Sequence, residues 1–225
     1  MVDVVDYRRK PLARTTARSR TRITFSKDES KDLLKSWLVL SIAYLFTYGT
    51  IIFYFPEVIL FILPYITIST GLTFIVHELA HKFVAQRHGL EAHYKSNDYL
   101  LALSLMISLS GFLFFTAGAV VIKGDYLDDR EIGHIAAAGP ISNLIIAGIF
   151  LPLSFIFPEI FFFKYLFGIN AWIGFYNMLP VGILDGLKIA RWSKLAFWLI
   201  ITTAIVLVVV DLFPYYANRI YFHYP

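Results

Sequence analysis

The stretch FIVHELAHKFVAQRHG, from Phe74 to Gly89, places two histidines and a glutamate at the end of a long apolar run. His77 and His81 are four residues apart, so on a helix both imidazoles lie on one face, a single turn apart. Glu78 projects at a neighbouring angle and can reach a water on a cation held by the two histidines. This pattern is typical of zinc metalloproteases, in which the glutamate is the general base. A structural pair of buried histidines is the weaker interpretation, because an intramembrane glutamate without a task is costly.

The composition is that of a membrane protein. The chain has 225 residues, of which 58% are hydrophobic and 16% are charged. A soluble domain is nearer half apolar and a quarter charged. The chain contains no cysteine, which excludes disulfides and thiolate ligands. A metal must therefore be held by imidazole and carboxylate groups.

Five apolar stretches approach the roughly 20 residues that a helix needs to span a bilayer. They cover residues 37–55, 58–84, 132–157, 160–184 and 195–212. A sixth stretch, 99–122, is uncharged but contains Gly111 and Gly118. We expect an all-α membrane protein, a polytopic helix bundle with about five to six transmembrane segments and a re-entrant or irregular segment.

The placement of charges predicts the orientation of the chain. Ten of the twenty Lys and Arg residues precede Trp37, and cytoplasmic segments carry the excess of positive charge. With this end inside, Lys188, Arg191 and Lys194 also lie inside only if the stretch 99–122 dips into the membrane and returns. We therefore favour the re-entrant interpretation over a sixth crossing, in the cell (cytoplasmic) membrane with a cytoplasmic N-terminus.

The same reasoning divides the chain into three parts. Residues 1–33 form a basic cytoplasmic tail, residues 34–213 a membrane-embedded metalloprotease domain, and residues 214–225 a short C-terminal tail. The basic tail either lies on anionic lipid headgroups or only sets the orientation. We expect no nucleic-acid binding, because the basic run at 8–22 lacks interleaved aromatic residues.

A catalytic zinc takes three protein ligands and leaves one position open for water. Side chains that the predicted topology puts on the inner side are His88, His93, His134, Glu91, Asp98, Asp125, Asp128, Asp129 and Glu131. Asp185 stands apart, because it follows NMLPVGIL, in which Pro180 and Gly182 would break a helix. The re-entrant topology brings Asp185 to the side of the membrane where His77 and His81 lie.

Three segments together resemble the site-2 protease family of intramembrane zinc metalloproteases. They are HELAH at 77–81, AAAGPISN at 136–143 and NMLPVGILDG at 177–186. The resemblance implies one zinc ion per chain, held by His77, His81 and Asp185 near the cytoplasmic side, with Glu78 as catalytic base. We expect a short form of the family, without a PDZ domain or a regulatory nucleotide-binding domain.

The resemblance also implies that Asn143, Asn177 and Pro180 line the cleft that holds the substrate. A substrate helix must unwind before it is cut, because its backbone is internally hydrogen-bonded. We expect the run GAVVI, which starts at Gly118, to offer edge hydrogen bonds to the unwound strand. The alternative for this stretch is a plain short membrane helix.

The predicted function is hydrolysis of a peptide bond in or near the transmembrane segment of a membrane-protein substrate, that is, regulated intramembrane proteolysis. The predicted partners are this substrate and the lipid bilayer, and dimerisation is left open. One alternative is a proteolytically inactive scaffold that binds transmembrane helices. Another is a membrane metalloprotease of the prenyl-protein-processing type, whose third ligand is a glutamate from a later helix. Glu159 is the glutamate offered there, and the predicted topology puts it on the outer side.

Overall fold

The computed structural model describes residues 2–4, 25–123 and 127–222. Within these ranges the chain forms eight helices and three short strands. In chain order they are β1 (Val2–Val4), α1 (Lys27–Phe46), α2 (Gly49–Tyr54), α3 (Val58–Arg87), β2 (Glu91–Ser96), α4 (Asp98–Ser108), β3 (Gly118–Lys123), α5 (Asp129–Ile156), α6 (Phe161–Asn177), α7 (Asp185–Trp192) and α8 (Lys194–Phe222). Helices dominate as predicted, but the all-α expectation did not include the small sheet.

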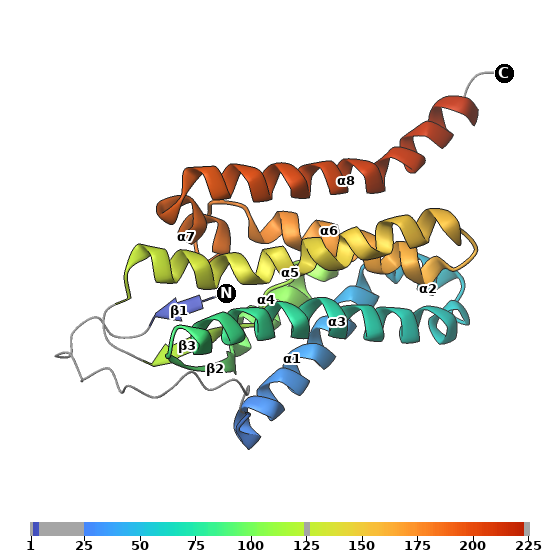
Figure 1. Cartoon of the computed structure of the whole chain (residues 1–225). Coiled ribbons are helices and arrows are strands. Elements are labelled where there is room, and N and C mark those ends of the chain that lie inside the picture. The colour runs from blue at the N-terminus through green and yellow to red at the C-terminus, as the bar shows by residue number, and fades with distance from the viewer. Residues whose placement is uncertain (1, 5–24, 124–126, 223–225) are drawn as a thin grey trace.

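Helix α5 is the centre of the bundle, in contact with α3, α6, α7 and α8. Figure 1 shows α3, α5, α6 and α8 running side by side, with the sheet and α7 at one end and α2 at the other. Small buried residues of α5, among them Ala136, Ala137, Gly139 and Ala147, let neighbouring helix backbones approach closely. Because both α3 and α7 pack on α5, side chains of α3 and α7 can contact each other next to α5.

Three helices in the described ranges are long and apolar enough to cross a membrane, namely α3, α5 and the part of α8 at Lys194–Phe213. This number is lower than the five to six segments predicted. The stretch 37–55 is not one helix, because the chain leaves α1 at Thr47, whose hydroxyl donates to the Tyr44 carbonyl at 2.7 Å. The stretch 160–184 is shortened because α6 ends at Asn177 after 17 residues.

The stretch 99–122 is irregular and folds back on itself, which confirms the predicted irregular segment. Helix α4 ends at Ser108, and Gly111 adopts a left-handed φ of 83° that favours glycine. The Asn97 N–H then donates to the Ala117 carbonyl at 2.9 Å, so the segment begins and ends at neighbouring points. Its two ends thus lie at the same end of the bundle.

The sheet has the strand order β1-β3-β2. Strand β2 pairs antiparallel with β3, from Glu91 opposite Lys123 to Ser96 opposite Gly118. Strand β1 pairs parallel with the other edge of β3, from Val2 opposite Val120 to Val4 opposite Ile122. The β-branched residues of β3 suit a strand.

A buried charge pair fastens α1 and β2 to α3, one residue beyond His81. The Lys82 ammonium lies 2.7 Å from both carboxylate oxygens of Glu29, and the Tyr94 N–H donates to the same carboxylate at 2.9 Å. Lys82 is 1% exposed and Glu29 is 3% exposed. Buried charges are tolerated when further hydrogen bonds satisfy the pair, as the Tyr94 bond does here. This Lys82–Glu29 pair holds the helical turn that carries the two histidines.

Candidate metal centre

His77 and His81 lie one turn apart on α3, as the four-residue spacing predicts. Their Nε2 atoms are 3.0 Å apart, and the side chains are 4% and 0% exposed. The Nδ1 of His81 lies 2.7 Å from the carbonyl oxygen of Ile135 on α5. Because a carbonyl can only accept, this Nδ1 carries the proton and Nε2 presents its lone pair toward His77.

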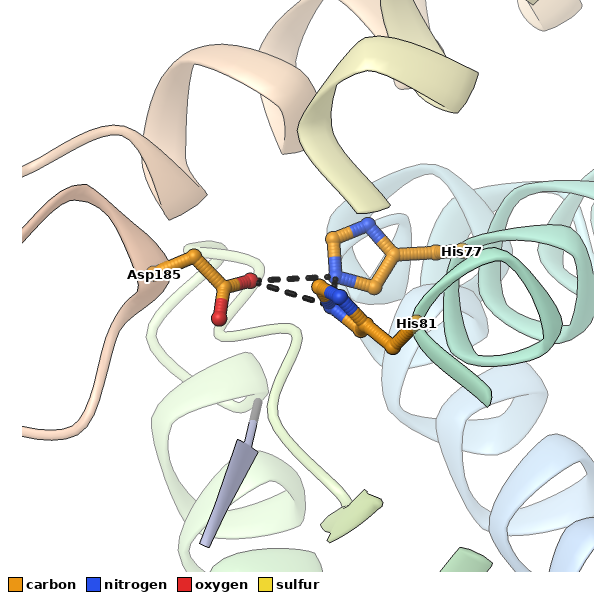
Figure 2. Close-up of side chains that lie close together, drawn as sticks. All are labelled: His77, His81 and Asp185. Atoms are coloured by element: carbon orange, nitrogen blue, oxygen red, sulfur yellow. Dashed lines mark hydrogen bonds and ion pairs between the residues drawn. The ribbon is translucent and has the colours of Figure 1, made fainter. Parts of the chain in front are cut away.

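Asp185 reaches the two imidazoles from the first turn of α7. Its Oδ2 lies 3.2 Å from His81 Nε2 and 3.5 Å from His77 Nε2, and Figure 2 shows the three side chains pointing toward one another. Asp185 is fully buried. The predicted meeting of the Leu-Asp-Gly segment with the paired histidines is therefore what the structure shows.

The chain between α6 and α7 is non-helical, and this break delivers Asp185. Gly182 there adopts a left-handed φ of 56°, which a side chain would disfavour. Gly186 packs directly on the backbone of Met178, and a Cβ at Gly186 would collide with the Met178 carbonyl. The glycine after Asp185 thus allows α7 to begin against the end of α6.

Gly139 of α5 provides the space that the imidazoles occupy. A Cβ at this position would lie 2.6 Å from His77 Cε1 and closer still to His81 Nε2, so no residue other than glycine fits without displacing the rings. Gly139 belongs to the segment AAAGPISN, but the sequence alone predicts no role for it. A glycine inside an apolar helix was the available signal, but only the tertiary structure shows what it faces.

The three side chains fit a tetrahedral divalent cation. Ligand atoms bound to zinc at about 2.1 Å in a tetrahedron lie roughly 3.4 Å apart, and the three observed separations are 3.0, 3.2 and 3.5 Å. Two imidazole nitrogens and one carboxylate oxygen are ligands that zinc accepts. In the described part of the chain, His77, His81 and Asp185 are the group of metal-ligating side chains with atoms this close together.

Glu78 stands at the edge of the same centre. It is 6% exposed and lines, with His77, a cavity of about 20 Å³, which has room for about one water molecule. The other lining residues are Phe74, Phe115, Thr116, Ala117, Gly118, Ile173, Asn177 and Leu184. A carboxylate and a water-sized space therefore adjoin the histidine pair.

The structure places the four predicted substrate residues differently from one another. Asn177 and Gly118 line the cavity. Asn143 is fully buried, and its Oδ1 lies 2.6 Å from His77 Nδ1, on the side of the ring away from Asp185. Pro180 is exposed between α6 and α7. A Cβ at Gly118 would meet the Tyr94 hydroxyl and the β2 backbone. A bulky substitution there would disturb the sheet itself, so it is a poor test of substrate binding.

The other histidines of the described ranges, His88, His93 and His134, lie apart from the metal centre. The His88 and His134 rings are 5.6 Å apart, and His134 stacks edge-on against Trp192 at 4.6 Å. His93 lies on β2, paired with Val121. None of them belongs to the close-packed ligand group in the described ranges, so Asp185 is the candidate that the structure brings to the pair.

Comparison with known proteins agrees with this geometry. A protein of Methanocaldococcus jannaschii named "Putative zinc metalloprotease MJ0611" is 35% identical over 182 residues, which cover 79% of this chain and 90% of the relative. The chain belongs to the site-2 protease family. The predicted family membership is thereby confirmed.

Two further relatives of this site-2 protease family member carry the same kind of name. Rip2 of Mycolicibacterium smegmatis is 30% identical over 130 residues, covering 49% of this chain and 50% of the relative. YwhC of Bacillus subtilis is 27% identical over 159 residues, covering 60% and 70%. No protein-family model matches the chain, and no solved structure matches it.

Gly139→Ala is expected to weaken metal binding by roughly 10- to 100-fold, the usual effect of disturbing the groups behind metal ligands. The added methyl group displaces the imidazoles of His77 and His81, since it occupies their space. Metal affinity is measured by competition with a chelator. Gly148→Ala is the matched control on the same helix, because nothing lies within 4 Å of a Cβ there. Equal affinities of the two variants would contradict the prediction.

Proposed function

We propose that the chain is a zinc-dependent endopeptidase that hydrolyses a peptide bond in or near the transmembrane segment of another membrane protein. The observation that carries the proposal is the meeting of His77, His81 and Asp185 within 3.5 Å beside the Glu78 cavity. Membership in the site-2 protease family and the apolar helices α3, α5 and α8 support it.

Zinc would be held by His77, His81 and Asp185, whose ligand atoms match its preferred spacing. When bound, zinc lowers the pKa of a water molecule to about 7 and polarises the substrate carbonyl. The imidazole of His81 is held in the ligating tautomer by the Ile135 carbonyl. Burial of all three side chains keeps bulk water from the ligands.

Glu78 is the proposed general base. It takes a proton from the water whose oxygen attacks the substrate carbonyl carbon, and it delivers that proton to the amide nitrogen as the C–N bond breaks. Its place beside His77, on the wall of a cavity that holds about one water, suits this task. Asp185 accepts no proton in this scheme, because it serves as a ligand.

The proposed substrate is held in an extended form along β3. An intact helix hides its backbone hydrogen bonds, whereas an unwound segment can pair with the edge of a strand. Gly118 at the start of β3 lines the Glu78 cavity. Strands β1 and β2 pair with the two edges of β3, so a substrate strand that takes the place of β1 would pass next to the site. We place the N-terminal tail and this site on the cytoplasmic side, because the basic residues gather there.

The two rival functions are less well supported. A prenyl-processing metalloprotease uses a glutamate as third ligand, whereas in the described structure an aspartate, Asp185, meets the imidazoles. An inactive scaffold has no need of a buried carboxylate at 3.2 Å from an imidazole next to a second carboxylate at the cavity.

Glu78→Gln is expected to lower the rate of peptide-bond cleavage by roughly 10²- to 10⁴-fold, because it removes the general base. The measurement is proteolysis of candidate single-span proteins in detergent, with the cut site located by mass spectrometry. Glu91→Gln, on the exposed start of β2, is the control and should cleave at the wild-type rate. A Glu78→Gln protein that cleaves normally would contradict the proposed role.

Asp185→Ala is expected to remove zinc from the purified protein, because two imidazoles alone leave the site one ligand short. Zinc content per chain is determined by elemental analysis, together with the cleavage rate. Asp129→Ala, an exposed carboxylate at the start of α5, should keep both. Full zinc content and activity in the Asp185 variant would point to a different third ligand.

A further inference from the structure

Asn170 of α6 belongs neither to the lining of the cavity nor to the ligand group. We infer that it is a positioning residue, which acts through Asn143 to set the orientation of the His77 imidazole. Asn170 and Asn143 are both fully buried in the apolar bundle. The inference rests on the proposed metal site.

The polarity of the Asn170 amide is set by a backbone carbonyl. Its Nδ2 donates to the Leu166 carbonyl at 2.8 Å, and a carbonyl can only accept. The oxygen of the Asn170 amide must therefore face Asn143, whose Nδ2 donates to it at 2.9 Å. The reversed amide would bring two acceptors together in a buried place.

The polarity of Asn143 follows from that of Asn170. The Asn143 Nδ2 has two hydrogens, of which one goes to Asn170 and the other to the Thr73 carbonyl at 3.2 Å. Its Oδ1 then faces His77 Nδ1 at 2.6 Å and accepts the proton of that nitrogen. The lone pair of His77 is thereby left on Nε2, which faces Asp185 and His81. A series of hydrogen bonds from Asn170 on α6 through Asn143 on α5 thus sets the tautomer of His77 on α3.

The test compares Asn170→Leu with Asn170→Asp. Leucine removes the acceptor for Asn143 and keeps the number and branching of the side-chain heavy atoms. A protonated aspartic acid, the form favoured by burial, keeps the acceptor and donates to the Leu166 carbonyl. We expect the leucine variant to lose roughly 10- to 100-fold in zinc affinity and the aspartate variant to retain wild-type affinity. Ile169→Val, a neighbouring buried change on α6 without a polar group, is the control for packing and should also retain it.

A second readout follows the proton itself. The ¹⁵N chemical shifts of the His77 ring in metal-free, histidine-labelled protein report which nitrogen is protonated, and they should show Nδ1–H in the wild type and the aspartate variant. A mixture of tautomers is expected in the leucine variant. The inference would be overturned if Asn170→Leu kept the wild-type tautomer of His77 and the wild-type zinc affinity. It would also be overturned if Asn170→Asp lost as much zinc affinity as Asn170→Leu. Neither readout requires proteolysis, so a protein that binds zinc without cutting would overturn only the proposed function.

A different observation, the strand register, carries a second proposal. Strand β2 occupies one edge of β3, and β1 occupies the other with its backbone parallel to β3. Figure 1 shows β1 at the end of the bundle where α7 also lies. We propose that residues Val2–Val4 compete with the substrate strand for this edge, so that the chain restrains its own activity. The proposal rests on the proposed function, in which β3 holds the substrate.

Two introduced cysteines test this competition, because the natural chain has none. Asp3 and Val121 are Cα partners, and partners on neighbouring strands lie roughly 4.8 Å apart, within the range of a disulfide. The pair Asp3→Cys and Val121→Cys should cross-link on oxidation, lose cleavage and recover it with reductant. The control pair His93→Cys and Val121→Cys uses the same β3 position but links β2, and it should cleave equally in both states.

The outcomes separate the two proposals. The competition would be overturned if the Asp3→Cys and Val121→Cys pair failed to cross-link. It would also be overturned if the cross-linked protein cleaved as fast as the same protein after treatment with reductant. A reduced protein that binds zinc and cleaves nothing would overturn the proposed function on which it rests.

Discussion

Two imidazoles and a carboxylate converge inside an apolar helix bundle, and the surrounding structure serves that convergence. His77 and His81 come from α3, whereas Asp185 comes from α7 more than a hundred residues later, and the three ligand atoms end within 3.5 Å of one another. Bringing them together requires α5 to lie close behind the rings. Gly139 permits this approach because it has no Cβ to fill the same space.

The low dielectric of the bundle explains the polar groups around the centre. A polar group buried in an apolar interior is costly unless it has a partner, and Asn143, Asn170 and the Leu166 carbonyl satisfy one another in sequence. The Lys82–Glu29 pair does the same for charges next to the second histidine. Such groups stabilise little by themselves, but they hold the ligands at one geometry. Rigid placement of ligands is what a metal site requires.

The small sheet beside the bundle has a different physical role. Extended backbone near a membrane must have its hydrogen bonds satisfied, and here β3 has a strand on each side. The fold-back of the segment between Asn97 and Ala117 brings β3 next to the histidines without crossing the bundle. In the proposed function, the substrate strand would take the edge of β3 that β1 occupies here, at the wall of a water-sized cavity.

The sequence by itself predicted the metal-ligand pattern of this protein and much of its architecture. The spacing of His77 and His81 is local, so helix periodicity alone put both rings on one face. The apolar runs predicted the long apolar helices, and the glycine-containing stretch predicted the irregular segment. The number of spanning helices was overestimated, because apolar composition does not show where Thr47 or the end of α6 interrupts a helix.

Other features were decided only by the tertiary structure. Charge and topology predict that Asp185 reaches the histidines, but its contact depends on how α7 packs on α5 and on the close approach of Gly186 to the Met178 carbonyl. The roles of Gly139 and Asn170 come entirely from packing, because each acts on residues far away in the sequence. Local periodicity carries no information about such neighbours, since they are set by the close approach of three helices in space.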